Sequence, residues 1–209
     1  CLTLLPATAF AAAEQDKSAG WIELLAVNLP REETVYTAGS GTITWTPELN
    51  SEGTAVSGTV TLDSAVIAAE KGGIVLPVPF TLVLKGSSTI TTRTGEPVSP
   101  EGVECAVFSR LNSLTITGPG SLTINSAGRA IEAFGDLTIR DGAAVTVNTQ
   151  GGDHAVYSGN IKTGDINIER GNITIEDSTL FITANSTNPP LYANGGRVSI
   201  QNSHVYVKS

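Results

Sequence analysis

The sequence is poor in the residues that usually carry chemistry. Of its 209 positions, aromatic residues make up 5% and charged residues 15%, with two histidines, two cysteines and no methionine. No motif contains either histidine, so nucleophilic catalysis has no support, and no Cys/His cluster suggests zinc. No apolar run reaches about 18 residues, which excludes a transmembrane helix. A net charge of −8 argues against nucleic acid or an anionic membrane as the partner.

Residues 1–13 read CLTLLPATAFAAA, an apolar run that ends in alanines of the small-x-small form. This predicts the rear half of a secretory signal peptide, and therefore a secreted or cell-surface protein. A lipidated Cys1 is the alternative, but an apolar run follows Cys1 where a lipoprotein would have a polar tether. Cys105 then has no partner for a disulfide. We interpret it as a small buried hydrophobe that faces the same way as Val107.

Val, Ile, Leu and Thr dominate the rest of the chain, with 22 glycines, and this composition favours strands. Residues 114–136 contain three short strands and three turns, and the stretch from residue 137 repeats the plan. A repeat of this size built only from strands and turns predicts a single-stranded parallel β-helix, a solenoid of about 22–25 residues per coil. Stacked coils would pair in parallel and fill the inside with aliphatic columns.

The repeat can be followed by its first strand, at residues 60–62, 82–84, 114–116, 137–139, 173–175 and 198–200. We expect these six segments to form one parallel sheet. Two long intervals predict insertions at residues 92–104 and 159–172, which should loop out without breaking the coils. Within the second insertion, residues 165–168 could form an extra strand.

The repeat divides the chain into three parts. After the signal peptide remnant, residues 14–57 are interpreted as a leader, an N-terminal cap and an irregular first coil, because terminal units of solenoids are atypical. Residues 58–209 are the predicted β-helix. The chain stops inside a coil, where an uncapped edge would be adhesive, so we expect further protein or domains beyond residue 209.

Recurrent motifs carry a family resemblance. Residues 135–139 (GDLTI) and 171–175 (GNITI) match one part of the repeat, and 130–133 (AIEA), 155–158 (AVYS) and 190–193 (PLYA) match another. Over residues 58–207 the chain resembles right-handed parallel β-helix proteins of bacterial surfaces, in particular secreted carbohydrate-binding domain-containing proteins. The resemblance implies an exported protein that binds plant or host polysaccharide, sometimes with calcium. The G-I-D-A-D form that would supply paired acidic ligands is absent, so we predict no metal and no other cofactor.

The best binding candidate is the outward position of the third strand in each coil. In chain order this position holds Val75, Phe108, Glu132, Tyr157 and Tyr192. Rings in a row offer a platform for the apolar faces of sugars, and a carboxylate and phenol hydroxyls could bind sugar hydroxyls. We therefore predict Phe108, Glu132, Tyr157 and Tyr192 as glycan-binding residues, with the rings exposed. The alternative is that the rings only pack on one another or lie under an inserted loop.

An enzyme on the same fold is the main competing interpretation. A polysaccharide lyase of the pectate lyase-like class could use Asp136, Arg140, Asp141 and Glu176, but aspartate is also favoured in turns by local backbone bonding. His154 follows a Gly-Gly-Asp that lacks the spacing of calcium-binding repeats, and we interpret it as a turn residue. We therefore predict a non-catalytic carbohydrate-binding or adhesive surface module. The alternatives are the lyase and a structural stalk of a larger surface protein.

Overall fold

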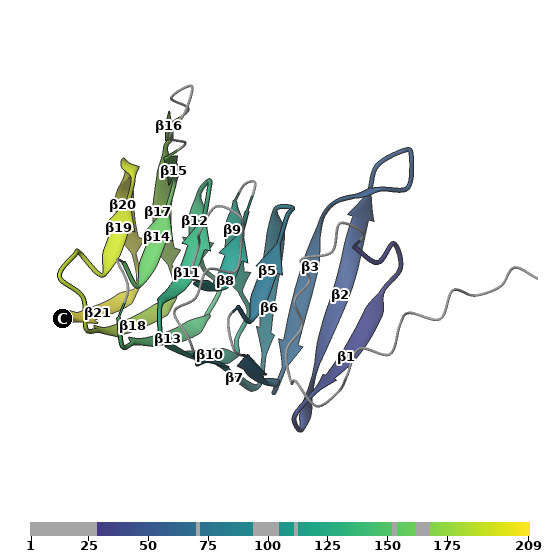
Figure 1. Cartoon of the computed structure of the whole chain (residues 1–209), viewed down its shortest axis with the longest axis horizontal. Coiled ribbons are helices and arrows are strands. Elements are labelled where there is room, and N and C mark those ends of the chain that lie inside the picture. The colour runs from purple at the N-terminus through teal and green to yellow at the C-terminus, as the bar shows by residue number, and fades with distance from the viewer. Residues whose placement is uncertain (1–28, 70–71, 94–104, 111–112, 152–153, 162–167) are drawn as a thin grey trace, which may run out of the picture.

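The computed structural model describes residues 29–209 except residues 70–71, 94–104, 111–112, 152–153 and 162–167. In this part of the chain the regular secondary structure consists of strands alone. The strands form three large sheets and one two-stranded sheet (Figure 1). The all-β class predicted from the content of aliphatic residues and threonine is therefore confirmed.

The largest sheet, sheet A, has eight strands. In spatial order they are β1 (Thr34–Ala38), β2 (Gly41–Leu49), β3 (Ala55–Asp63), β6 (Phe80–Lys85), β9 (Leu114–Thr117), β12 (Leu137–Ile139), β17 (Gly171–Glu176) and β20 (Gly195–Gln201). The first three strands pair antiparallel. Every later neighbour pairs in parallel, as predicted.

The other two large sheets are parallel throughout. Sheet B contains β4 (Val66–Ala69), β7 (Ser87–Thr92), β10 (Ser121–Ser126), β13 (Ala144–Thr149), β18 (Thr179–Ala184) and β21 (His204–Lys208). Sheet C contains β5 (Ile74–Leu76), β8 (Cys105–Ser109), β11 (Arg129–Ala133), β14 (Val156–Ser158) and β19 (Leu191–Ala193). From β3 onward the chain contributes one strand to sheet A, one to sheet B and one to sheet C, and then repeats this order. We call each such set of strands a coil. Coil 1 begins with β3, and coil 6 contains β20 and β21.

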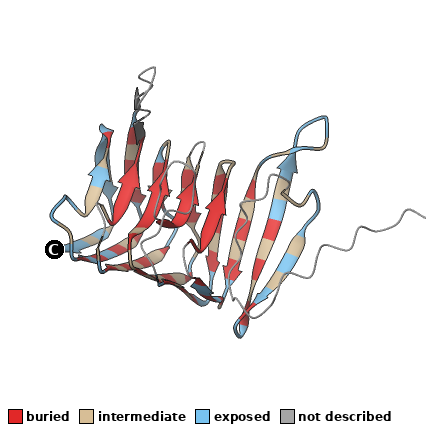
Figure 2. Cartoon of the chain, viewed as in Figure 1, coloured by how far each residue is buried: buried red, intermediate tan, exposed pale blue. Residues whose placement is uncertain are grey.

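Alternation along the strands builds the core. In sheet A, Leu114, Leu137 and Ile173 occupy one register position and are fully buried. The threonine that follows each of them is only partly buried, which is the expected pattern when successive side chains point to opposite faces of a sheet. Buried residues from all three sheets belong to one continuous core cluster, visible as the red bands in Figure 2. The predicted inward stacking in these coils is confirmed.

The predicted register of coil 2 was wrong by two residues. Phe80, not Leu82, pairs with Leu114 in the next coil. Phe80, Leu82 and Leu84 alternate with more exposed residues and are all buried. A shift of two residues keeps every side chain on its own face, so the hydrophobic pattern alone does not distinguish the two registers.

The turns from sheet A to sheet B use left-handed backbone. The non-glycine residues with positive φ are Ser64, Asp141, Asp177 and Asn202, at φ between 46° and 58°. Each follows a strand of sheet A and precedes a strand of sheet B. Aspartate and asparagine tolerate this conformation better than most residues do. The position of Asp141 thus has a local structural reason, as the turn interpretation requires.

The strands β1, β2 and β3 pair as regular antiparallel strands, although the sequence predicted an irregular first coil in this region. Trp45 on β2 is fully buried, and its indole N–H donates to the carbonyl of Pro30 at 3.0 Å. Gly58 on the paired strand β3 lies against this ring, so that a β-carbon there would collide with it. The large ring and the glycine are therefore complementary, and together they pack the N-terminal end of the described core.

The two predicted insertions leave the stack intact. Residues 94–104 of the first lie outside the described residues, yet the flanking strands β7 and β8 both pair with the following coil. The second contains β15 (Asn160–Ile161) and β16 (Ile168–Glu169), which pair antiparallel in a separate hairpin. Because β14 pairs directly with β19, this hairpin adds no coil. The possible extra strand is partly realised, since Ile168 begins β16.

Removing the hairpin should leave the fold unchanged. A side chain at Gly171 would collide with the backbone of Gly159, so the two ends of the insertion already touch. We expect that replacing residues 160–170 by Asn-Gly preserves the far-UV circular dichroism, because a shorter loop costs little closure entropy. Deleting the same length across β13, residues 140–150, should abolish the sheet signal. Loss of that signal in the hairpin variant would show that the hairpin is integral to the stack.

Candidate functional site

The predicted column on sheet C exists. Val75 pairs in register with Phe108, Phe108 with Glu132, Glu132 with Tyr157, and Tyr157 with Tyr192. Tyr157 and Tyr192 lie on adjacent strands, with ring centroids 5.9 Å apart. The expectation that these two rings are neighbours on successive coils is confirmed.

The predicted exposure of the column was wrong for most of its length. Tyr192 is 37% exposed, whereas Tyr157 is 7%, Glu132 2% and Phe108 0% exposed. Phe108 belongs to a second apolar cluster outside the main core, where its ring and that of Phe134 pack in a T-shaped arrangement with centroids 4.9 Å apart. The alternative, that the rings of the column pack on one another, describes Tyr157 and Tyr192, whereas the partner of Phe108 lies outside the column. A side chain that points away from one core is here buried in another.

A second outward position lies beside this column. In sheet C two consecutive residues face the main core, such as Ala106 and Val107 on β8. The residue before them therefore faces outward, and Cys105 belongs to the second cluster. The prediction that Cys105 and Val107 face the same way was wrong, because the strand does not alternate strictly at this point. The equivalent residues in the next two coils are Arg129 and His154.

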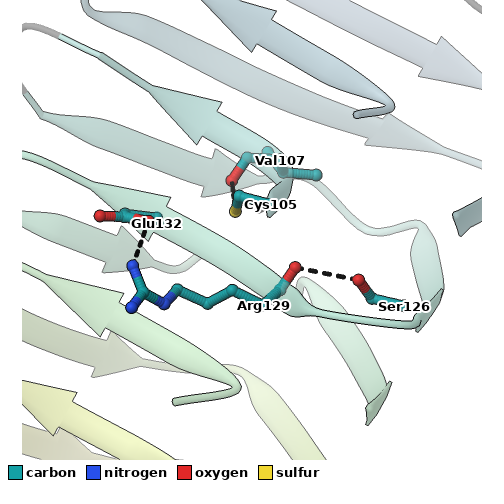
Figure 3. Close-up of polar contacts among 5 residues, drawn as sticks. All are labelled: Cys105, Val107, Ser126, Arg129 and Glu132. Carbon is teal, nitrogen blue, oxygen red and sulfur yellow. Dashed lines mark hydrogen bonds and ion pairs between the residues drawn. The ribbon is translucent and has the colours of Figure 1, made fainter. Parts of the chain in front are cut away.

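Arg129 and Glu132 form an ion pair on this outer face. The Nη1 atom of Arg129 lies 2.6 Å from Oε2 of Glu132, and the two side chains are only 18% and 3% exposed (Figure 3). The Arg129 carbonyl also accepts a hydrogen bond from Ser126 at 3.0 Å. A pair this close and this sheltered from water holds both side chains in place. Breaking such a pair is strongly destabilising, because removal of one charge leaves the other one buried.

Cys105 lies in the same neighbourhood but is not a nucleophile. Its thiol donates to the Val107 carbonyl at 3.0 Å (Figure 3). Burial raises the pKa of this thiol well above its usual value, and the negative charge of Glu132 raises it further, while Arg129 lowers it. The thiol therefore stays protonated near neutral pH, and only the thiolate reacts readily. The interpretation of Cys105 as a small buried hydrophobe is confirmed.

Three rings, those of Tyr157, His154 and Tyr192, cluster in mutual contact next to Arg129. The guanidinium carbon of Arg129 lies 4.8 Å from the ring centroid of Tyr157. The His154 ring stacks on Tyr157 at 5.4 Å and on Tyr192 at 4.5 Å, the latter within 7° of parallel. The Nδ1 of His154 lies 2.7 Å from the Pro189 carbonyl, which can only accept a hydrogen bond, so Nδ1 carries the hydrogen. These contacts hold the His154 ring in place, and His154 in turn supports one face of the Tyr192 ring.

Arg129 and His154 were not predicted from the sequence as site residues. His154 does lie in a connection, just before β14, but it also stacks on two tyrosines. A four-residue pattern in the sequence could have identified both residues. In it, an outward residue is followed by alanine, an aliphatic residue and a second outward residue. It occurs at residues 105–108 (CAVF), 129–132 (RAIE) and 154–157 (HAVY). Strict alternation was assumed there, and so the first residue of each pattern was overlooked.

Two of the four candidates for lyase chemistry, Asp136 and Asp141, accept hydrogen bonds from a neighbouring coil. One carboxylate oxygen of Asp136 accepts hydrogen bonds from the backbone and side-chain amides of Asn172, at 2.8 and 3.0 Å. Asp141 accepts one from Thr117 at 2.9 Å and lies 3.3 Å from Arg140 in an exposed ion pair. Across the described residues, no three His, Cys, Asp or Glu side chains gather in a way that could hold a metal ion. Both aspartates thus join neighbouring coils, which is a structural role but not the local backbone bonding that the turn interpretation predicted.

Comparison with known proteins adds no relative. No protein family, no curated protein and no solved structure matches the chain. The resemblance to secreted carbohydrate-binding proteins thus stays a prediction.

Proposed function

We propose that the protein is an exported, non-catalytic module that binds polysaccharide through the outer face of sheet C on a right-handed parallel β-helix. The repeated order of sheets A, B and C supports the β-helix. Handedness follows from a general rule, because crossovers between parallel strands of one sheet are right-handed in about 98% of cases. Residues 1–13, which lie outside the described residues, support export by their composition alone. No described helix is long and apolar enough to cross a membrane.

The observation that carries the proposal is the supported ring of Tyr192. It is the most exposed residue of the column at 37%, and the His154 ring stacks almost parallel against it. Aromatic side chains bring large apolar area at a fixed geometry, and a ring already held in place loses little freedom when a sugar stacks on it. The proposed site is thus smaller than the one that the sequence predicted: Tyr192 contacts the ligand, while His154, Tyr157, Arg129 and Glu132 position its ring.

Two further observations favour this role over catalysis on pectin-like substrates. Two of the three acidic candidates of the lyase interpretation, Asp136 and Asp141, already accept hydrogen bonds that join neighbouring coils. The net charge of −8 repels a polyanion such as polygalacturonate. We therefore propose a neutral polysaccharide as the ligand. A structural stalk would carry the same fold without the supported ring.

Replacing Tyr192 by alanine should weaken binding without unfolding the protein. Loss of one stacking contact costs on the order of 1 kcal/mol, which corresponds to about a fivefold weaker affinity. Affinity electrophoresis in hydroxyethyl cellulose or xylan measures the change. Tyr192→Phe, which keeps the ring, should bind nearly as well as the parent, and Val35→Ala, at an exposed site on β1, is the surface control. Equal migration of Tyr192→Ala and the parent would contradict the site, and a parent that binds neither glycan would favour the stalk.

A further inference from the structure

We propose a second polysaccharide site on the outer face of sheet B, centred on Phe181 and Tyr206. This inference rests on the proposed function but on different residues. Phe181 on β18 and Tyr206 on β21 pair in register, are 46% and 57% exposed, and have ring centroids 6.3 Å apart. Neither ring contributes to the site on sheet C.

The exposure of both rings follows from the direction in which they point. On β18 the residues on either side of Phe181, Leu180 and Ile182, are fully buried in the main core. Phe181 must therefore face outward, and Tyr206 shares its register position. Large rings on a solvent-facing side of a strand are costly to keep exposed, and such residues frequently mark a binding surface.

The surroundings of the rings match a sugar better than a protein. In register with them, the same column continues as Thr146, Thr123 and Thr89. In the next column the Asn148 amide donates to Asn125 at 2.9 Å. The outward residues of β10, β13 and β18 carry no charge, and apart from Phe181 they are small or carry hydroxyl or amide groups. A stable protein interface needs about 1,000 Å² or more of well-packed surface, which two rings on a polar face do not supply. Rings beside aligned hydroxyls and amides suit a glycan chain.

The angle between the rings indicates whether they can bind a crystalline surface or a single polysaccharide chain. Their planes are tilted by 51°, so both rings cannot lie flat on one crystal face. A single chain whose successive sugars rotate can contact both. We therefore infer a soluble or amorphous neutral polysaccharide that runs along the column, across strands spaced by about 4.8 Å.

The two sites face different directions. Sheets B and C both bury their inner residues in the main core, so their outer faces point away from it on different sides of the coil (Figure 1). A short oligosaccharide can occupy only one site at a time. A long polymer, or two polymers, can engage both, which raises the apparent affinity for polymer through effective concentration. The protein would then cross-link polysaccharide chains.

The test compares binding stoichiometry and polymer binding in matched variants. Titration calorimetry with cellohexaose and xylohexaose should give about two sites for the parent and about one for Phe181→Ala/Tyr206→Ala, and the variant should bind amorphous cellulose or xylan on the order of tenfold more weakly. Val66→Ala removes an exposed apolar side chain from the far end of the same column and should behave like the parent. Circular dichroism checks that each variant is folded.

The outcomes separate the two proposals. If the Phe181/Tyr206 variant keeps the parent's stoichiometry and affinity for polymer, the second site is overturned while the Tyr192 site stands. If no variant and no parent binds either hexasaccharide or polymer, the proposed function is overturned and the second site with it. The ring tilt led us to infer that the ligand is a single chain whose successive sugars rotate. Tighter binding to crystalline than to amorphous cellulose would overturn that inference.

Discussion

Ile139→Asp should unfold the protein or cost it several kcal/mol of stability. Ile139 is fully buried on β12, in register between Ile116 and Ile175 of the neighbouring coils. A carboxylate placed there has no partner, and burial of an unpaired charge or polar group costs several kcal/mol. Small domains are stable by only about 5–15 kcal/mol. Loss of the β-sheet circular dichroism, or a large drop in the midpoint of urea unfolding, would show the effect.

The adjacent residue provides the control for this prediction. Thr138 lies on the same strand but is partly exposed on the outer face, so Thr138→Asp should change stability by well under 1 kcal/mol. Ile139→Val removes one methylene from the core and should cost about 1 kcal/mol. An Ile139→Asp variant as stable as Thr138→Asp would contradict the inward orientation of the sheet A column.

Arg129→Leu should destabilise the protein by about 3 kcal/mol, the second largest effect that we expect. Glu132 is 2% exposed, and the guanidinium of Arg129 lies 2.6 Å from its carboxylate. The variant loses this close ion pair in a site sheltered from water, and the contact of Arg129 with the Tyr157 ring is lost as well. Urea unfolding at neutral pH measures the loss of stability.

A double-mutant cycle separates the charge effect from packing. Glu132→Leu leaves Arg129 without its carboxylate, and Arg129→Leu/Glu132→Leu replaces both charges by apolar side chains. The double variant should be more stable than Arg129→Leu, because replacing both members of a buried pair is often nearly neutral. If Arg129→Leu costs less than about 0.5 kcal/mol, the pair behaves like a surface ion pair and does not position Tyr157 and His154. Binding by this variant would then equal that of the parent.

Predictions from the alternation of apolar and polar residues succeeded where this alternation alone decides the structure. Alternation of apolar residues and threonine at 114–116 and 137–139 indicated both the strands and their inward faces, and the structure confirms them. The long intervals indicated the insertions correctly, since β14 pairs with β19 across the second one. Period-2 alternation failed at coil 2, where a shift of two residues leaves the faces unchanged.

The candidate site was predicted only in part. The column from Val75 to Tyr192 could be aligned from the repeat, because each coil places the same strand position one strand spacing further along. Arg129 and His154 were missed, because sheet C turns two consecutive residues toward the core. Phe181 and Tyr206 were not predicted as a site, although the structure places them in register on adjacent strands.

The sequence by itself determined the all-β class, the parallel sheets and the order of the strands, because these depend on side-chain periodicity and turn residues within about 25 positions. Only the tertiary structure decided which outward residues meet water. Phe108 and Tyr192 occupy the same column, yet one is fully buried and the other is 37% exposed. The physical reason is that exposure depends on what packs over a face. A strand pattern specifies the direction of a side chain and contains no information about what covers it.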